Sequence, residues 1–232
     1  MDEGTYQLQE IVEPAALIKS KARVQTHGEV FTPKWMVQKM LAEPAIQEKL
    51  QDIHATFLEP SAGEGAFLVE ILHQKLNHVD QTSSKTRWPE NALWALMSIY
   101  GIELLHDNLN QARAAMMSVA TSHYQAIMQK PLNIRSDFYK AAQYVIGVNI
   151  VQGNTLEYTT EEGQPITLSH WWPVDTHTVQ RELFTYQSLF KTDGNDEIGI
   201  PEGQMSLFEA HDYNPHYAPC KVTKVYREEM QK

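Results

Sequence analysis

The residues of this sequence best suited to binding a ligand form a glycine loop, residues 59–65 with the sequence EPSAGEG. The loop follows the short apolar run 55–59 and precedes an apolar-spaced helix that begins at Ala66. A strand, a glycine turn and a helix make one half of a βαβ unit, in which a ligand lies beyond the carboxyl ends of the strands. Gly63 and Gly65 leave room for the backbone to approach a ligand closely, and amide groups at the helix start can face its polar end. A plain tight turn is the structural alternative.

Glu103 is the acidic residue that belongs with this loop. A second strand is predicted over residues 98–105, and Glu103 lies at its carboxyl end. An acidic side chain there can accept hydrogen bonds from both hydroxyls of a ribose, whereas a solvated carboxylate at a strand end is the alternative. The loop lacks the GxGxxG spacing and a following Lys-Ser or Lys-Thr, so it fits neither a nicotinamide-dependent dehydrogenase nor a P-loop nucleotidase.

The elements that position these residues alternate between helices and strands. We expect a short amphipathic helix over 8–24 and a helix over 34–50, with Thr32 as its N-cap and Pro33 as its first residue. The longer of these helices should carry four apolar side chains on one side, those of Trp35, Val37, Met40 and Leu41. Strands are predicted at 55–59, 98–105 and 149–152, a loop at 80–90, and a helix from Asp107 to about Gln129. This alternation indicates an α/β fold with a mostly parallel sheet flanked by helices.

The chain divides into three parts. Residues 1–53 hold the N-terminal helices and the loop at 26–33, and residues 54–190 form the main domain. Within the main domain, two short strands at 165–169 and 184–186 are separated by Trp171, Trp172 and Pro173. Residues 191–232 are predicted to be an exposed linker, rich in Gly, Asp, Asn and Pro at its start, followed by an irregular C-terminal tail.

Composition limits the classes of function. The net charge is −10, and proteins that grip DNA alone usually carry a basic face, which this chain lacks; its densest basic run is Lys19, Lys21 and Arg23. A single cysteine, Cys220, excludes an internal disulfide and leaves no Cys-x-x-Cys metal site, and no metal site is expected. No apolar run is long enough to span a membrane and the N-terminus lacks a secretory signal, so we expect a cytoplasmic protein.

Four segments of the chain resemble motifs of the adenine-N6 DNA methyltransferases of restriction-modification systems. Residues 57–68 (FLEPSAGEGAFL) are similar to the family's D-P-A-C-G-S-G-x-F-L motif, and residues 28–33 (GEVFTP) to its preceding G-x-[FY]-[FY]-T-P motif. Residues 100–103 (YGIE) resemble its ribose-binding strand, and residues 150–154 (IVQGN) its next strand end, usually G-D, with Asn154 in place of Asp.

This resemblance implies a Rossmann-like methyltransferase fold and S-adenosylmethionine as cofactor. By the motifs it matches, the cofactor-binding residues would be Phe31, Thr32, Pro33, Glu59, Pro60, Ala62, Gly63, Gly65, Phe67, Glu103, Leu104 and Asn154.

The family's N-P-P-[YF] motif, which holds the flipped base, does not follow Asn154. The nearest match, Asn214, Pro215 and Tyr217, lies 60 residues later, where a turn is the favoured interpretation. A target-recognition region is missing as well. We therefore expect either a split enzyme, whose second chain supplies this motif and contacts DNA, or a non-catalytic regulatory protein with the same fold. A small-molecule or protein methyltransferase is a third, less favoured interpretation.

A last motif lies at residues 204–208 (QMSLF), which resembles the Q-L-[SD]-L-F peptide that docks bacterial proteins on the sliding clamp of DNA polymerase. Leu207 and Phe208 would fill an apolar pocket while Gln204 makes polar contacts. The alternative, which we favour, is that Leu207 and Phe208 pack on this domain or on a methyltransferase partner.

Overall fold

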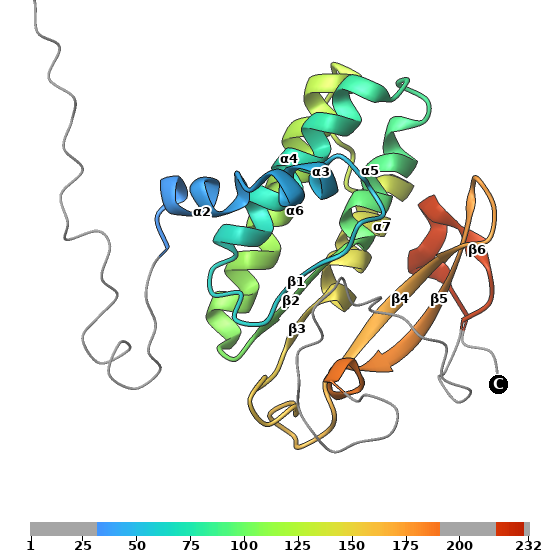
Figure 1. Ribbon diagram of the computed structural model, residues 1–232. Coiled ribbons are helices and arrows are strands. Elements are labelled where there is room, and N and C mark those ends of the chain that lie inside the picture. The colour runs from blue at the N-terminus through green and yellow to red at the C-terminus, as the bar shows by residue number, and fades with distance from the viewer. Residues whose placement is uncertain (1–31, 191–216, 230–232) are drawn as a thin grey trace, which may run out of the picture.

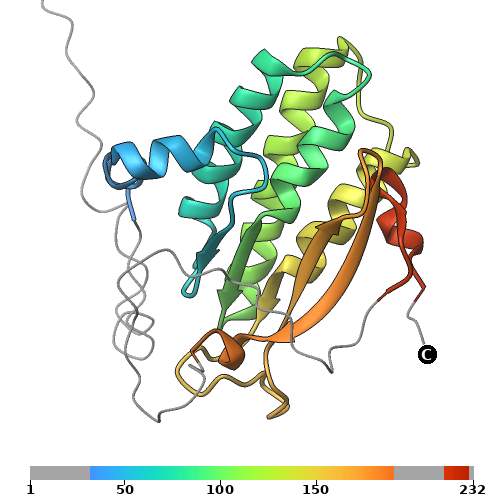
Figure 2. The same cartoon turned by 45° about the vertical axis from the view of Figure 1, so that its right-hand side comes forward.

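A computed structural model describes residues 32–190 and 217–229 of the chain as a mixed α/β structure with two sheets. Figure 1 shows the long helices standing side by side against the first sheet, and Figure 2 shows the hairpin of the second sheet lying beside β3 and the last of these helices. The sequence pattern predicted this alternation of helices and strands correctly. It missed two helices and the full extent of the second sheet.

The first sheet is parallel and has the strand order β1-β2-β3 within the described residues. Its strands are β1 (Phe57–Glu59), β2 (Ile99–Glu103) and β3 (Ile150–Gln152). The central strand, β2, is buried along its whole length. Glu59 pairs with Gly101, and Glu103 pairs with Gln152, so all three strands end at the same edge of the sheet. The polar residues that follow each strand therefore come together there.

Four helices pack against one another and against this sheet: α4 (Ala66–Thr82), α5 (Trp88–Met97), α6 (His106–Met128) and α7 (Asp137–Asn149). Helix α4 turns a stripe of apolar residues inward at helical spacing, namely Leu68, Ile71, Leu72, Leu76 and Val79. Helices α5 and α7 were not predicted from the sequence. Helix α5 is buried nearly all round and has little amphipathic pattern, which is why its periodicity gave no clear signal.

Lys75 of α4 is fully buried and fixes the segment that leads into β1. Its ammonium donates hydrogen bonds to the carbonyls of Asp52 (2.8 Å) and Ala55 (2.6 Å) and to the Ser98 hydroxyl (2.8 Å). Burial lowers the pKa of this side chain to about 7. One side chain of α4 thus joins the start of β1 to the residue before β2.

The second sheet is antiparallel and consists of β4 (Thr167–Pro173), β5 (Thr178–Thr185) and β6 (Cys220–Lys221). Trp171 joins it to the first layer, because its indole N–H donates to Asn149 Oδ1 (3.0 Å) at the end of α7. The 3-10 helix η2 (Tyr186–Phe190) follows β5, and η3 (Val222–Arg227) follows β6. The segment 171–173, expected between two strands, is instead the end of β4.

The expected irregular tail is ordered over residues 217–229 and packs against the main domain. Val222 and Val225 are completely buried, and the Glu228 carboxylate pairs with the buried guanidinium of Arg181 on β5. Tyr144 of α7 also donates its hydroxyl to Glu228. Our division at residue 191 therefore has to be corrected, since the chain after the intervening residues returns to complete the second sheet.

The expected helix over 34–50 is two helices, α2 (Lys34–Leu41) and α3 (Pro44–Leu50), with Pro44 at the start of the second. Pro33, not Thr32, is the N-cap of α2, and no side chain caps it. Val37 and Leu41 are buried as predicted, whereas Trp35 and Met40 are exposed, so the prediction of one four-residue apolar face is wrong. The helix expected at 8–24 lies outside the described residues.

Two negative findings apply to the described residues. None of their helices is long and apolar enough to cross a bilayer. Within the same ranges, no group of three or more His, Cys, Asp or Glu side chains is arranged to hold a metal ion.

Candidate functional site

The carboxyl edge of the parallel sheet brings the glycine loop and Glu103 into direct contact. The Gly63 amide donates to Glu103 Oε2 at 2.7 Å. A second contact along the backbone, from the Ala62 amide to the Ile102 carbonyl (2.9 Å), holds the loop against the end of β2. The two features that the sequence predicted to share one edge therefore meet there.

Glu103 is more deeply embedded than a ribose acceptor was expected to be. The residue is only 6% exposed. Its Oε1 accepts hydrogen bonds from the Leu105 amide (2.9 Å) and from Asn108 Nδ2 (3.3 Å). A carboxylate has about four lone-pair positions, and these two bonds and the one from Gly63 use three of them. In this arrangement Glu103 can accept about one further hydrogen bond, whereas the sequence led us to expect it to accept from both hydroxyls of a ribose.

The two glycines of the loop have different roles, although both lie in the left-handed region, with φ of 55° at Gly63 and 89° at Gly65. A Cβ on Gly63 would meet no atom within 4 Å. A Cβ on Gly65 would lie 2.9 Å from Ala112 Cβ and 3.0 Å from Ala112 Cα, on α6. Gly65 therefore packs closely on α6, which is a structural reason for a glycine at this position that the sequence did not indicate. Gly63 is the glycine that faces open space.

The remaining loop residues surround this contact. The Ser61 amide donates to Glu59 Oε1 (3.1 Å), and burial raises the pKa of Glu59 above its usual range. Pro60 is exposed, Ala62 is buried and Phe67 is half-buried at the start of α4. Leu104 is an apolar side chain 45% exposed, directly after Glu103. Apolar and polar groups therefore both line this part of the edge.

Asn154, at the end of β3, is held in a local turn. Its Oδ1 accepts from the Leu156 amide (3.0 Å), and its backbone pairs with Thr159. The preceding Gly153 amide donates to the Glu103 carbonyl (3.0 Å), which keeps the end of β3 beside the end of β2. The structure thus places Asn154 at the predicted edge but gives its side-chain oxygen a structural partner.

The other predicted site residues are partly outside this group. Thr32 and Pro33 lead directly into α2, while Phe31 lies outside the described residues. Tyr217 bonds to β5 through its amide and the Arg181 carbonyl (2.8 Å), and its ring packs on the Arg181 guanidinium, 4.6 Å from ring centre to Cζ. Tyr217 therefore belongs to the second sheet. Asn214 and Pro215, and the docking residues Gln204, Leu207 and Phe208, lie outside the described residues.

Asn108 is the residue at this edge that sequence analysis missed. It is 1% exposed, in the first turn of α6, and donates to the Glu103 carboxylate. Its position in the sequence could have indicated this role, because Asn108 lies in the first turn of a predicted helix, five residues after Glu103. The first turn of such a helix faces back toward the end of the strand that it follows.

The chain matches no family model, no curated protein and no solved structure. The functional argument therefore rests on the residues and geometry described above.

Proposed function

We propose that this chain is the S-adenosylmethionine-binding part of an adenine-N6 DNA methyltransferase, with a Rossmann-like fold completed by a second chain. The observation that carries the proposal is the contact between Gly63 and Glu103 at the carboxyl edge of a parallel sheet. The motifs around 57–68, 100–103 and 150–154 resemble those of this family, and the strands that carry them lie next to one another in the order β1-β2-β3.

The residues at the edge fit a nucleoside-containing cofactor. The open space beside Gly63 leaves room for its close approach, and Glu103 retains one acceptor position for a ribose hydroxyl. Leu104, exposed beside Glu103, offers an apolar surface for a purine ring. The cofactor would supply a methyl group on a positively charged sulfur. The chain's own residues would bind it and orient it, which is the main requirement of this reaction.

A second chain is part of the proposal because the sequence holds no N-P-P-Y motif after Asn154 and carries a net charge of −10. Within the described residues β1 pairs with β2 alone, so its other edge is available to a further strand. A partner strand there would end beside the glycine loop. The same partner would supply the surface that reads DNA.

The test is methyl transfer from labelled S-adenosylmethionine into DNA, with this chain alone and with the product of the neighbouring gene. Incorporation that requires both chains, and that is lost when Glu103 is changed to Ala, would support the proposal. A tight complex that binds cofactor but transfers no methyl group to DNA would favour a regulatory protein. If S-adenosylmethionine binds neither to this chain alone nor to the two chains together, the assignment is overturned.

A further inference from the structure

We propose that helix α2 is a DNA-contacting surface of this chain, with Lys34 and Lys39 on phosphates and Trp35 against a base or sugar. The inference deepens the proposed function and rests on it, because it names a surface through which this subunit itself touches the substrate. It also gives a role to the apolar side chains that the fold leaves on the outside of α2.

Helix α2 presents two different faces. Val37 and Leu41 are 1% and 5% exposed and pack inward. Trp35 and Met40 are 63% and 57% exposed, although both are large apolar side chains. Among the described residues no partner covers them. A surface that exposes a tryptophan next to cations is typical of binding sites for nucleic acid strands, where an aromatic ring stacks on bases.

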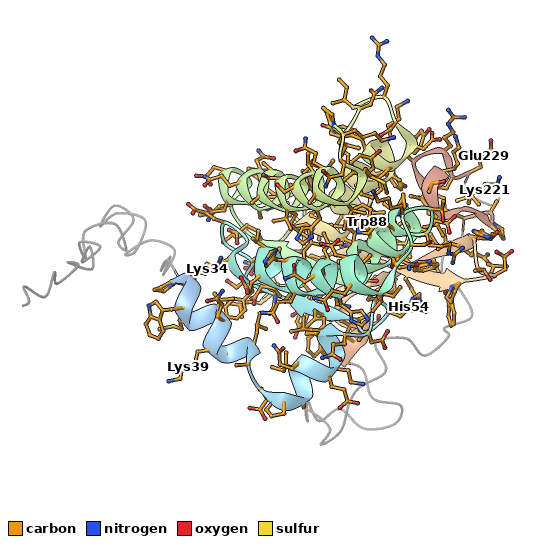
Figure 3. All side chains as sticks on the ribbon, turned by 90° about the horizontal axis from the view of Figure 1, so that it is seen from above. Lys34, Lys39, His54, Trp88, Lys221 and Glu229 are labelled. Atoms are coloured by element: carbon orange, nitrogen blue, oxygen red, sulfur yellow. The ribbon has the colours of Figure 1, made fainter. Side chains whose placement is uncertain are left out.

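Helix α2 is a basic element of this acidic protein. The helix has the sequence KWMVQKML, with two lysines and no acidic residue. From Lys19 to Lys39 the sequence holds five Lys or Arg and one Glu, a net charge of +4 within a chain whose total is −10. Figure 3 shows Lys34 and Lys39 on α2 at the margin of the molecule. A local basic segment on an acidic protein complements phosphates and not another acidic surface.

The position of α2 relates this surface to the candidate site. Gln38 donates to Glu70 Oε1 (3.3 Å), one turn from the start of α4, and α4 begins directly after the glycine loop. DNA bound along α2 would therefore run past the carboxyl edge of the sheet. A protein partner could also use an exposed Trp and Met, but the lysines favour DNA, because Lys is depleted in the centre of protein interfaces.

The experiment measures binding of the full chain to a short labelled oligonucleotide by fluorescence anisotropy, as a single strand and as a duplex, over a range of salt concentrations. The double variant Lys34→Gln/Lys39→Gln should weaken duplex binding and reduce the slope of log K against log salt by about 1.8. Trp35→Ala should weaken single-strand binding by about fivefold or more. The matched control is Lys130→Gln/Arg135→Gln, which removes the same charge from exposed positions near the α6–α7 connection and should change neither value.

S-adenosylmethionine titration of the same proteins separates the two proposals. Wild type that binds the cofactor but not DNA at low salt would overturn the role of α2 and leave the proposed function standing. Wild type that binds neither would contradict both. Equal losses in the control and α2 variants, or loss of partner binding in Trp35→Ala with DNA binding unchanged, would also overturn the inference. DNA binding at the wild-type level by Lys34→Arg/Lys39→Arg, which keeps both positive charges, would support it.

Discussion

Substitution by alanine at the two glycines of the loop should affect stability and cofactor binding to different extents. In Gly65→Ala, the new Cβ would lie 2.9 Å from Ala112 Cβ on α6, at a residue whose φ is 89°. Left-handed backbone costs an L-residue about 1–2 kcal/mol, and overpacking of this kind costs about 1–3 kcal/mol. The free energy of unfolding should therefore fall by about 2–5 kcal/mol, which lowers the melting temperature of a domain of this size by roughly 4–20 °C.

Gly63→Ala also places an L-residue in the left-handed region, but without the clash, because nothing lies within 4 Å of the new methyl group. It should lower stability by only about 1–2 kcal/mol. Its methyl group would occupy the space in which the cofactor is proposed to lie, so the loss of S-adenosylmethionine affinity should exceed that caused by the same strain elsewhere. Thermal unfolding and calorimetric titration of both variants give the comparison. If Gly63→Ala destabilises the fold as much as Gly65→Ala, the separation of packing and binding roles is wrong.

Three further predictions concern buried charged groups. Glu103→Ala should cost about 3 kcal/mol of stability, since the Gly63 and Leu105 amides lose their acceptor, and chemical denaturation can measure this. Burial lowers the pKa of Lys75 to about 7, so between pH 7 and about 10 this lysine is neutral in the folded chain and protonated in the unfolded chain. The free energy of unfolding should therefore rise with pH over this range, and Lys75→Met should abolish the rise. Glu228→Ala leaves the Arg181 guanidinium buried without its carboxylate partner, so the free energy of unfolding should fall by about 3–5 kcal/mol in the same denaturation assay. An unchanged midpoint would show that residues 217–229 do not stabilise the fold.

Local sequence signals predicted the elements around the candidate site well. The run 55–59, the glycine turn and the apolar spacing after Ala66 gave β1, the loop and α4 close to their observed positions. Glu103 was identified as a candidate because an acidic residue at a strand end, next to a glycine loop, is typical of sites that bind a ribose. Its embedding by Leu105 and Asn108 was not predicted, since it depends on how α6 packs back on β2.

The errors arise where long-range packing decides the outcome. Trp35 has the apolar character of a core residue but faces outward, because α2 packs only its Val37 and Leu41 side on α4. The C-terminal residues lack a strong pattern, yet Val222 is buried after β6 pairs with β5 across a large sequence separation. Helix α5 is buried on nearly all sides, so its apolar residues show no clear helical periodicity.

The most direct test of the account is a calorimetric titration of the chain with S-adenosylmethionine, using wild type, Glu103→Ala and a control variant, Glu161→Ala. Glu161 is an exposed acidic residue that pairs with His106 at the start of α6, so its loss removes a charge near the same edge without touching the Gly63 contact. We expect one binding site in wild type and in the control. Removing a hydrogen bond to a charged group costs about 1.5–3 kcal/mol, so Glu103→Ala should bind about ten- to a hundredfold more weakly. No binding to wild type, or equal affinity in all three proteins while each remains folded, would contradict the account.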